Sequence, residues 1–323
     1  RKESNLSLGK MESATLVNYP TAKFVLDELG KQMLFLLKAT REAPCSPLDK
    51  RLDSLELIAS RLSSLYGNNQ QWVPQVVRSY VMLSLEFLNL QRRLEESGRY
   101  LLSSEREALE QVYQNKDVFG AYYLSGLLLS EALWPNHHKL GCAFTDSFLT
   151  LLSSKSKVLE VGVGTGFHLY HLKNRLPDIA YEGVDISDYA IEFARKFAFG
   201  DKERLPGNYS FYRQDATKGL DCRDETYDAV ILGEVLEHVE DPESLLKEMA
   251  RVARKISPMF ITTVVFAANI DHIYLFEKAD DIRKLITKTP WDVEREWVLP
   301  IYPEDTPEME KRPMNYGAIL RKR

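Results

Sequence analysis

The sequence predicts an α/β fold for the C-terminal half of the chain and an all-α fold for the N-terminal half. Between about residues 20 and 152, apolar residues recur at helical spacing and strand-like runs are few. From residue 158 onward, short apolar runs alternate with helical segments, which is the order expected of a parallel sheet with helices on both faces. We therefore place a helical domain at residues 1–152 and a sheet-containing domain at residues 153–323.

Two apolar stripes and one capping signal define the N-terminal helices. Side chains three or four positions apart form such stripes when one face of a helix is buried in a core. The second stripe runs through residues 73–94, and Ser104-x-x-Glu107 has the spacing of a capping box that starts a further helix. The first stripe consists of Leu52, Leu55, Ile58, Leu62 and Leu65.

Seven strands are predicted in the C-terminal half. The first four are apolar runs at residues 158–161, 180–184, 209–213 and 227–232. Strands at 259–266, 293–299 and 315–321 complete the set, with a helix at 278–287. Strands and helices that alternate in this way belong to βαβ units.

The first predicted strand runs into a glycine-rich turn. Residues 158–168 read Val-Leu-Glu-Val-Gly-Val-Gly-Thr-Gly-Phe-His. Glycines at 162, 164 and 166 allow the backbone to turn sharply and to approach a ligand closely. The dinucleotide fingerprint G-x-G-x-x-G would need its third glycine at position 167, where this chain has Phe167. The turn therefore predicts a ligand site whose glycine spacing differs from that of the dinucleotide fingerprint.

Polar residues follow the next three strands. Asp185 ends the second strand about 20 residues after the turn, where an acidic side chain meets a ribose in nucleotide-binding βαβ units. Asp215 follows the third strand, and residues 233–242, Gly-Glu-Val-Leu-Glu-His-Val-Glu-Asp-Pro, follow the fourth. The carboxyl ends of parallel strands lie at one edge of a sheet, so we expect these residues to face one crevice.

With these motifs in this order, the chain resembles the class I S-adenosylmethionine-dependent methyltransferases, most closely those of ubiquinone and menaquinone biosynthesis. The resemblance covers about residues 157–323 and implies a Rossmann-like seven-stranded sheet whose last strand is antiparallel. It implies an S-adenosylmethionine-dependent methyltransferase that binds the methionine part at the turn, the ribose at Asp185 and the adenine at Asp215. The cofactor-binding residues that it implies are Glu160, Gly162, Gly164, Gly166, Asp185, Ile186, Asp215, Ala216, Leu232 and Gly233.

The residues after the fourth strand are the candidates for catalysis. A sulfonium methyl group is already reactive, so the protein must align the acceptor and remove its proton. His238 has a near-neutral reference pKa that suits a general base, and Glu237 and His138 are further candidates. In an alternative interpretation, the Glu237-His238 pair before an acidic-Pro turn only shapes the loop.

A second cluster, in the segment from Tyr123 to His138 at the junction of the two halves, predicts the substrate side of the site. In relatives with an N-terminal helical extension, this segment closes over the cofactor, and clefts between domains commonly hold ligands. The alternative is that the aromatic residues fill a core between the halves while the paired histidines start a solvated helix. The candidate substrate residues are Tyr123, Trp134, His137, His138 and His272.

The same region offers a metal-binding alternative. Glu234, Glu237 and His238 are spaced so that one helical face presents two carboxylates and an imidazole, and His272 could add a fourth ligand. Small-RNA 3′-end 2′-O-methyltransferases have a similar local pattern. Mixed carboxylate and imidazole ligands suit Mg²⁺, Mn²⁺ or Fe²⁺. A divalent metal is an alternative here, and we do not expect one.

Composition restricts the class of partner. The net charge of −5 and the pI of about 5.8 argue against a nucleic-acid surface spread over the whole protein, so small-molecule substrates fit better. The three cysteines indicate neither a disulfide framework nor a zinc site. We expect no membrane span and no signal peptide, a cytoplasmic protein, and a homodimer through the helical half as an open alternative.

These observations predict methyl transfer from S-adenosylmethionine to a small-molecule metabolite, in a specialised biosynthetic pathway. Two other hypotheses stay open at this point. One is a metal-dependent RNA 2′-O-methyltransferase that uses the four metal-ligand candidates. The other is a methyltransferase-like regulatory or scaffold protein whose helical half binds a partner.

Overall fold

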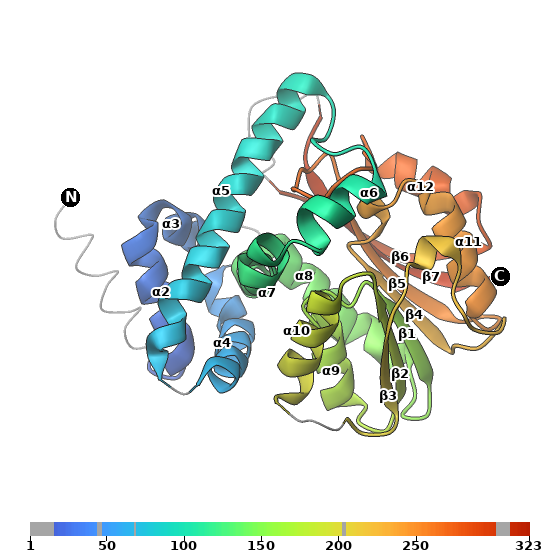
Figure 1. Ribbon diagram of the computed structural model, residues 1–323, viewed down its shortest axis with the longest axis horizontal. Helices are drawn as coiled ribbons and strands as arrows, with labels where there is room; N and C mark the ends of the chain where they lie inside the picture. The colour runs from blue at the N-terminus through green and yellow to red at the C-terminus, as the bar shows by residue number, and fades with distance from the viewer. Residues whose placement is uncertain (1–15, 44–46, 68, 202–204, 302–310) are drawn as a thin grey trace.

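The computed structural model describes residues 16–43, 47–67, 69–201, 205–301 and 311–323. In Figure 1 the N-terminal helices occupy one side of the molecule and a sheet with flanking helices occupies the other. Within these described ranges every strand lies after residue 156, so the predicted division into a helical half and a sheet-containing half is confirmed at the level of secondary structure. Whether the boundary at residue 152 separates independently folding domains stays a prediction.

The sheet has seven strands in the order β3-β2-β1-β4-β5-β7-β6. The first five pair in parallel, whereas β7 is antiparallel to both β5 and β6, as the resemblance implies. Each predicted strand is present, with ends that differ by at most two residues. The strands are β1 (Lys157–Val161), β2 (Ala180–Asp185), β3 (Tyr209–Arg213), β4 (Ala229–Gly233), β5 (Pro258–Val265), β6 (Trp291–Pro300) and β7 (Met314–Lys322).

Buried apolar residues hold the sheet between two layers of helices. Every residue of β5 is buried, which is typical of a central strand covered on both faces. Figure 1 shows α9 and α10 on one side of the sheet and α11 and α12 on the other. These helices are α9 (Phe167–Arg175), α10 (Asp188–Phe199), α11 (Pro242–Val252) and α12 (Ala279–Thr287).

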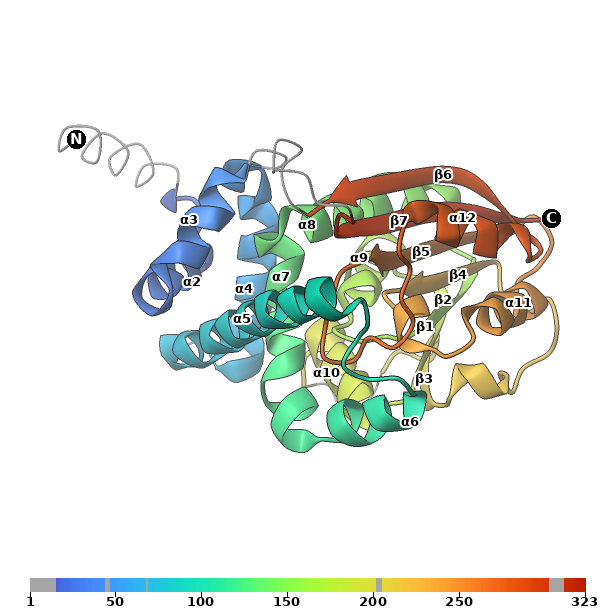
Figure 2. The same cartoon turned by 90° about the horizontal axis from the view of Figure 1, so that it is seen from above.

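The N-terminal half is built around one long helix. Figure 2 shows α5 extending from the other N-terminal helices toward the sheet. Leu83, Leu90 and Leu94 of α5 belong to the same buried cluster as residues of β1, β4 and β5. The principal helices are α2 (Pro20–Gln32), α3 (Leu34–Glu42), α4 (Leu52–Tyr66), α5 (Val73–Ser97), α7 (Leu124–Leu133) and α8 (Pro135–Ala143).

Side-chain hydrogen bonds fix α5 to the loop that follows β5. The Gln91 Nε2 atom donates to the Phe266 carbonyl at 3.1 Å, and the Ala268 N–H donates to Gln91 Oε1 at 3.0 Å. The Tyr100 hydroxyl donates to the Ala267 carbonyl at 2.9 Å. A buried amide that satisfies two backbone groups in this way specifies how the two halves meet.

The capping signal at Ser104 is present in part. Ser104 Oγ accepts from the Glu107 N–H at 3.3 Å, but Glu107 Oε2 accepts from the Ser103 N–H at 2.9 Å instead of from Ser104. The helix that starts here, α6 (Glu105–Ala108), is short. Wider π-helical turns follow at Leu109–Tyr113 and Lys116–Tyr123, and they end in two tyrosines of the site described below.

No helix among the described residues has the length and apolar character needed to cross a membrane. Cys142 and Cys222 are free thiols, and Cys45 lies outside the described ranges.

Candidate functional site

A cavity of about 1290 Å³ lies between the helical half and the carboxyl ends of the central strands. Its floor is the turn after β1 and the ends of β2 and β4, and its walls come from α3, α5, α7, α8 and the end of β6. Small-molecule sites usually enclose roughly 300–1,000 Å³. This cavity is therefore large enough for a cofactor together with a second molecule.

The glycine turn supplies backbone that only glycine adopts easily. Gly164 has φ of +46°, and a Cβ at this position would meet no atom within 4 Å, because the residue faces the open cavity. Gly166 has φ of +75°, and a Cβ there would lie 2.7 Å from the Ala194 Cα atom. Gly164 thus leaves room for a ligand, whereas Gly166 lets α10 pack against the turn.

Asp185 lies at the end of β2 beside this turn. Its Oδ1 accepts from the Ser187 N–H at 2.8 Å, and its Oδ2 accepts from the Gly164 N–H at 3.3 Å. Burial raises the pKa of Asp185 to about 6, although the hydrogen bonds from the backbone oppose this shift. The carboxylate is therefore fixed in direction and has accepting capacity left for a ligand hydroxyl.

Asp215 caps the short 3₁₀ helix Ala216–Lys218 at the end of β3. Its Oδ1 accepts from the Thr217 N–H at 3.1 Å, and its Oδ2 pairs with Lys218 Nζ at 2.7 Å. Burial acts to raise the pKa of Asp215, but the hydrogen bonds from Lys218 and Thr217 outweigh it and the pKa is lowered. Asp215, Ala216 and Ile186, which the resemblance implies for cofactor binding, all line the cavity. The adenine contact stays a prediction.

Glu160 and Leu232 do not line the cavity, although both were predicted to bind the cofactor. The Glu160 carboxylate accepts from the Tyr181 hydroxyl at 2.5 Å and lies 3.1 Å from His168 Nδ1. Burial acts to lower the pKa of His168, but the hydrogen bond and charge of Glu160 raise it overall. Glu160 therefore orients His168, whose ring packs directly against Gly233.

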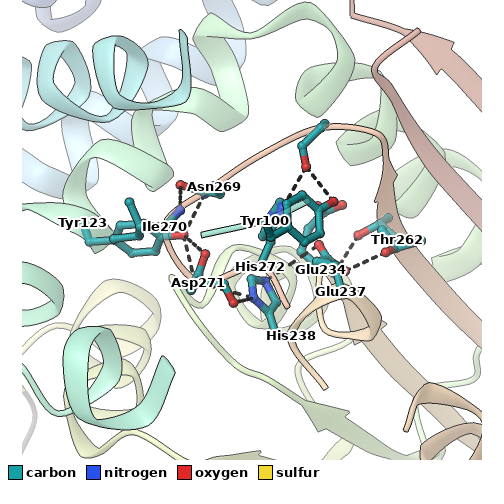
Figure 3. Close-up of polar contacts among 12 residues, drawn as sticks. Tyr100, Tyr123, Glu234, Glu237, His238, Thr262, Asn269, Ile270, Asp271 and His272 are labelled. Atoms are coloured by element: carbon teal, nitrogen blue, oxygen red, sulfur yellow. Dashed lines mark hydrogen bonds and ion pairs between the residues drawn. The ribbon is translucent and has the colours of Figure 1, made fainter. Parts of the chain in front are cut away.

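Beyond β4, carboxylates and imidazoles from two loops meet (Figure 3). Glu237 is fully buried, and its Oε2 accepts from Thr263 Oγ1 at 2.6 Å. Its other oxygen, Oε1, has no hydrogen-bond partner among the described residues. His238 Nε2 lies 3.8 Å from that oxygen. An unpartnered buried carboxylate oxygen beside an imidazole marks a place where a ligand would be stabilised.

Backbone hydrogen bonds join the two loops that carry this cluster. The N–H groups of Ile273 and Tyr274 both donate to the Glu237 carbonyl, at 2.9 and 3.0 Å. Glu234 starts the turn with φ of +51°, and its N–H donates to Thr262 Oγ1 at 3.0 Å. A left-handed backbone conformation costs free energy for a residue other than glycine, and such residues concentrate at functional sites.

Both histidines of the cluster have one ring nitrogen engaged by the backbone. His238 Nδ1 lies 3.0 Å from the Asp271 carbonyl, and His272 Nδ1 lies 2.9 Å from the Ala267 carbonyl. A ring nitrogen facing a carbonyl must carry the proton, which leaves the Nε2 lone pair free in a neutral ring. Burial lowers the pKa of His272 to about 3, so this ring is neutral at physiological pH.

The four predicted metal-ligand candidates are only partly brought together. Ligand atoms of Glu237, His238 and His272 lie within 4.8 Å of one another. Glu234 lines the same cavity but is not one of this group. Burial raises the pKa of Glu237 to about 7 and that of Glu234 well above its usual range, with the neighbouring Glu237 adding to the latter shift.

The predicted substrate residues separate into two groups. Tyr123, Trp134, His137 and His272 line the cavity. The Tyr123 hydroxyl donates to the Asp271 carboxylate at 3.0 Å, and burial together with the Asp271 charge raises its pKa well above the usual range. Tyr123 therefore stays protonated.

The two adjacent histidines of α8 point in different directions. His137 lies 3.0 Å from Ser130 Oγ and faces the cavity, and burial lowers its pKa to about 4. His138 does not line the cavity, and its ring lies 3.8 Å from the Cys142 sulfur. Successive helical residues are about 100° apart, so the two rings face different surroundings.

Sequence reasoning missed several residues of this cavity. Tyr113 ends a π-helical turn and Asn269 and Asp271 lie in the loop after β5, and no local spacing indicates their place in the site. Glu131 also lines the cavity, and here a signal existed. It is the one charged residue in the apolar run of residues 124–133.

Comparisons with known proteins agree with this geometry. Residues 159–260 match a family described as a methyltransferase domain. The chain is 37% identical to a phosphatidylethanolamine N-methyltransferase of Cereibacter sphaeroides, over 31% of this chain and 46% of that protein. It is 28% identical to a ubiquinone biosynthesis O-methyltransferase of Aliivibrio fischeri (strain MJ11), over 42% of this chain and 55% of that protein.

A plant enzyme is also similar. The chain is 26% identical to norajmaline N-methyltransferase of Rauvolfia serpentina, over 50% of this chain and 59% of that protein. The chain thus spans about half the length of the curated relatives that it matches. The family match, the strand order and the turn at Gly164 together identify a class I S-adenosylmethionine-dependent methyltransferase domain in this chain, with S-adenosylmethionine as its cofactor.

Proposed function

We propose that the protein transfers the methyl group of S-adenosylmethionine to a small-molecule acceptor bound in the cavity between its two halves. One observation carries this proposal. The glycine turn and Asp185 line the same cavity as Glu237, His238 and His272. A cofactor site and a cluster of proton-accepting groups therefore share one enclosed space, as methyl transfer requires.

The residues at the turn fit the cofactor. Gly164 faces open space where a side chain would intrude, and the Asp185 carboxylate is held so that it can accept from ribose hydroxyls. The bound cofactor supplies an activated methyl group. The remaining tasks of the protein are to align the acceptor, to exclude water and to take up the proton that the acceptor loses.

We assign the proton uptake to His238. The Asp271 carbonyl holds its Nδ1, which leaves Nε2 free as the accepting atom. Glu237 Oε1, at 3.8 Å from Nε2, stabilises the imidazolium that would form. His138 lies outside the cavity lining, which argues against its candidacy as the base.

The walls of the cavity favour an organic acceptor with an apolar body. Phe35, Phe87 and Trp134 contribute aromatic surface to the wall of the helical half. The relatives are named for O-methylation in ubiquinone biosynthesis and for N-methylation of norajmaline and of phosphatidylethanolamine. Compounds of these three kinds form the first acceptor panel, and a role in a specialised biosynthetic pathway stays part of the proposal. The homodimer and the cytoplasmic location stay predictions.

A second candidate is transfer to a hydroxyl group assisted by a divalent metal. The specific observation is the group of Glu237 Oε1, His238 and His272, in which the free Nε2 atoms and the unpartnered oxygen could ligate one ion. Two imidazoles and one carboxylate suit Fe²⁺, Mn²⁺ or Zn²⁺. Lys139 is the one lysine or arginine along the described cavity wall, so the site gives little support to a polyanionic RNA acceptor.

Methyl-labelled S-adenosylmethionine distinguishes the candidates. Label should pass to a member of the acceptor panel with wild-type protein and with the control His171→Gln, whose ring lies outside the cavity lining. It should pass much more slowly with His238→Gln. Activity that is unchanged after chelation supports the first candidate, and activity restored only by added metal supports the second. If the protein does not bind the cofactor at all, the proposal fails and the regulatory or scaffold hypothesis gains.

A further inference from the structure

Glu131 is an acidic residue in an otherwise uncharged helix. It lies on α7, next to the buried residues Ser130 and Ala132, and its side chain faces the cavity. In Figure 1, α7 and α8 lie between α2 and α4 on one side and the sheet on the other. The helical half thus brings a carboxylate to a cavity whose floor belongs to the cofactor-binding half.

The Glu131 carboxylate has no protein hydrogen-bond partner among the described residues. Burial raises its pKa to about 8, the charge of His168 opposes this shift, and the charge of Glu234 adds to it. Glu131 is half-buried, so its carboxylate faces the cavity with its accepting capacity free for a ligand. A ligand that supplies the partner would explain its presence.

The surroundings of Glu131 select for positive charge. The charge of His168 acts on Glu131, but His168 already pairs with Glu160 at 3.1 Å. Glu234 adds a second carboxyl group to the cavity lining, and its charge acts on Glu131. Lys139 is the sole lysine or arginine that the described lining contributes. A cation bound here would therefore have to come with the ligand.

We propose that Glu131, with Glu234 at the end of β4, forms a binding site for an ammonium group. Each carboxylate can accept charge-assisted hydrogen bonds from such a group. The shared chemistry has two sources, the α-ammonium of the methionine part of the cofactor and an amine on the acceptor.

The position of the site favours the cofactor as the source. His168 lies two residues after Gly166 and packs against Gly233, and Glu131 lines the same cavity as the glycine turn and the end of β4. The helical half would then complete the cofactor site as well as cover it. An ammonium group from the cofactor requires only that the protein binds the cofactor. An ammonium group from the acceptor also rests on the proposed function.

Two adenosine ligands separate these sources. S-adenosylhomocysteine contains the α-ammonium, and 5′-methylthioadenosine lacks the amino-acid part. In calorimetry, Glu131→Gln should bind S-adenosylhomocysteine about tenfold to a hundredfold more weakly than wild type and 5′-methylthioadenosine equally well. The matched control is Glu192→Gln on the exposed face of α10, where Glu192 pairs with Lys196, and it should leave both affinities unchanged.

The other outcomes are equally distinct. If both affinities persist in Glu131→Gln but binding of the aromatic amine tyramine, measured with S-adenosylhomocysteine present, is lost, the ammonium comes from the acceptor. If neither ligand nor tyramine responds to the substitution, the proposal is overturned. Failure of wild type to bind S-adenosylhomocysteine would contradict the proposed function, and tyramine binding would then decide the ammonium site alone.

A second variant distinguishes loss of ligand binding from loss of folding. Glu131→Leu removes the carboxyl group and should melt no lower than wild type, because leucine suits the apolar helix. It should still lose affinity for S-adenosylhomocysteine while it keeps affinity for 5′-methylthioadenosine. An unfolded variant would lose both, so retained 5′-methylthioadenosine binding shows that the site is intact.

Discussion

Replacing Asp185 with Asn tests the cofactor site with a nearly isosteric change. Asn keeps one acceptor oxygen, which can still accept from the Ser187 N–H, but places an NH₂ group beside the Gly164 N–H or toward the ligand. Hydrogen bonds to a charged group contribute about 1.5–3 kcal/mol. Affinity for S-adenosylmethionine should therefore fall about tenfold to 150-fold.

The same substitution removes a pH dependence. Burial raises the pKa of Asp185 from 3.8 to about 6, so the carboxylate protonates as the pH falls through about 6. If the cofactor binds only when Asp185 is ionised, protonation of this carboxylate makes wild-type affinity fall about tenfold per pH unit below about pH 6. In Asp185→Asn this dependence should disappear.

Calorimetric titrations between pH 5 and 8 measure both effects. Asp188→Asn is the matched control, because Asp188 lies three residues away, is exposed and pairs with Arg213. Its affinity and pH profile should equal those of wild type. An Asp185→Asn protein that binds as tightly as wild type, or that keeps the loss of affinity below pH 6, would refute the assignment of Asp185 to the cofactor.

Three further predictions concern the cluster and the fold. His238→Gln should lower turnover about 10²–10⁴-fold, as loss of a general base does, while cofactor affinity stays within about twofold of wild type. Stopped assays and calorimetry check this, with His171→Gln as a control that should behave as wild type. Unimpaired turnover in His238→Gln would exclude His238 as the base. If a metal binds, His272→Gln should lower the metal content found by elemental analysis after dialysis against Mn²⁺, whereas equal content in wild type and variant would dismiss this ligand set. Gly166→Ala should lower the free energy of unfolding by about 1–3 kcal/mol, because its Cβ would lie 2.7 Å from the Ala194 Cα atom and its φ is +75°. The control Gly207→Ala, whose Cβ would meet no atom within 4 Å, should lower it much less. Equal losses of the two variants in urea unfolding would contradict this account.

Much of the fold followed from local patterns in the sequence. The strand runs, the glycine turn and the acidic residues after the strands are each readable within a few residues, and the sheet confirms their order. The fourth strand begins at Ala229 instead of 227, because Tyr227 forms only an isolated bridge to Ala253 before the ladder starts. Such ends depend on the partner strand, which local composition does not reveal.

The candidate site was less predictable, because contacts between distant segments decide it. Glu160 carries the acidic position of the turn motif, yet its carboxylate faces Tyr181 of the neighbouring strand and His168. His272 reaches His238 only because the loop after β5 is bound to the Glu237 carbonyl. Neither contact can be inferred from spacing along the chain, whereas the lone acid Glu131 in its apolar helix could have been singled out.

The most direct test of the shared cavity is a crystal structure of the protein with S-adenosylhomocysteine. The account predicts the ribose at Asp185, the amino-acid part over the glycine turn, and the sulfur on the side of Gly233 that faces His238. A ligand bound outside this cavity, or one whose sulfur faces away from Glu237 and His238, would contradict it.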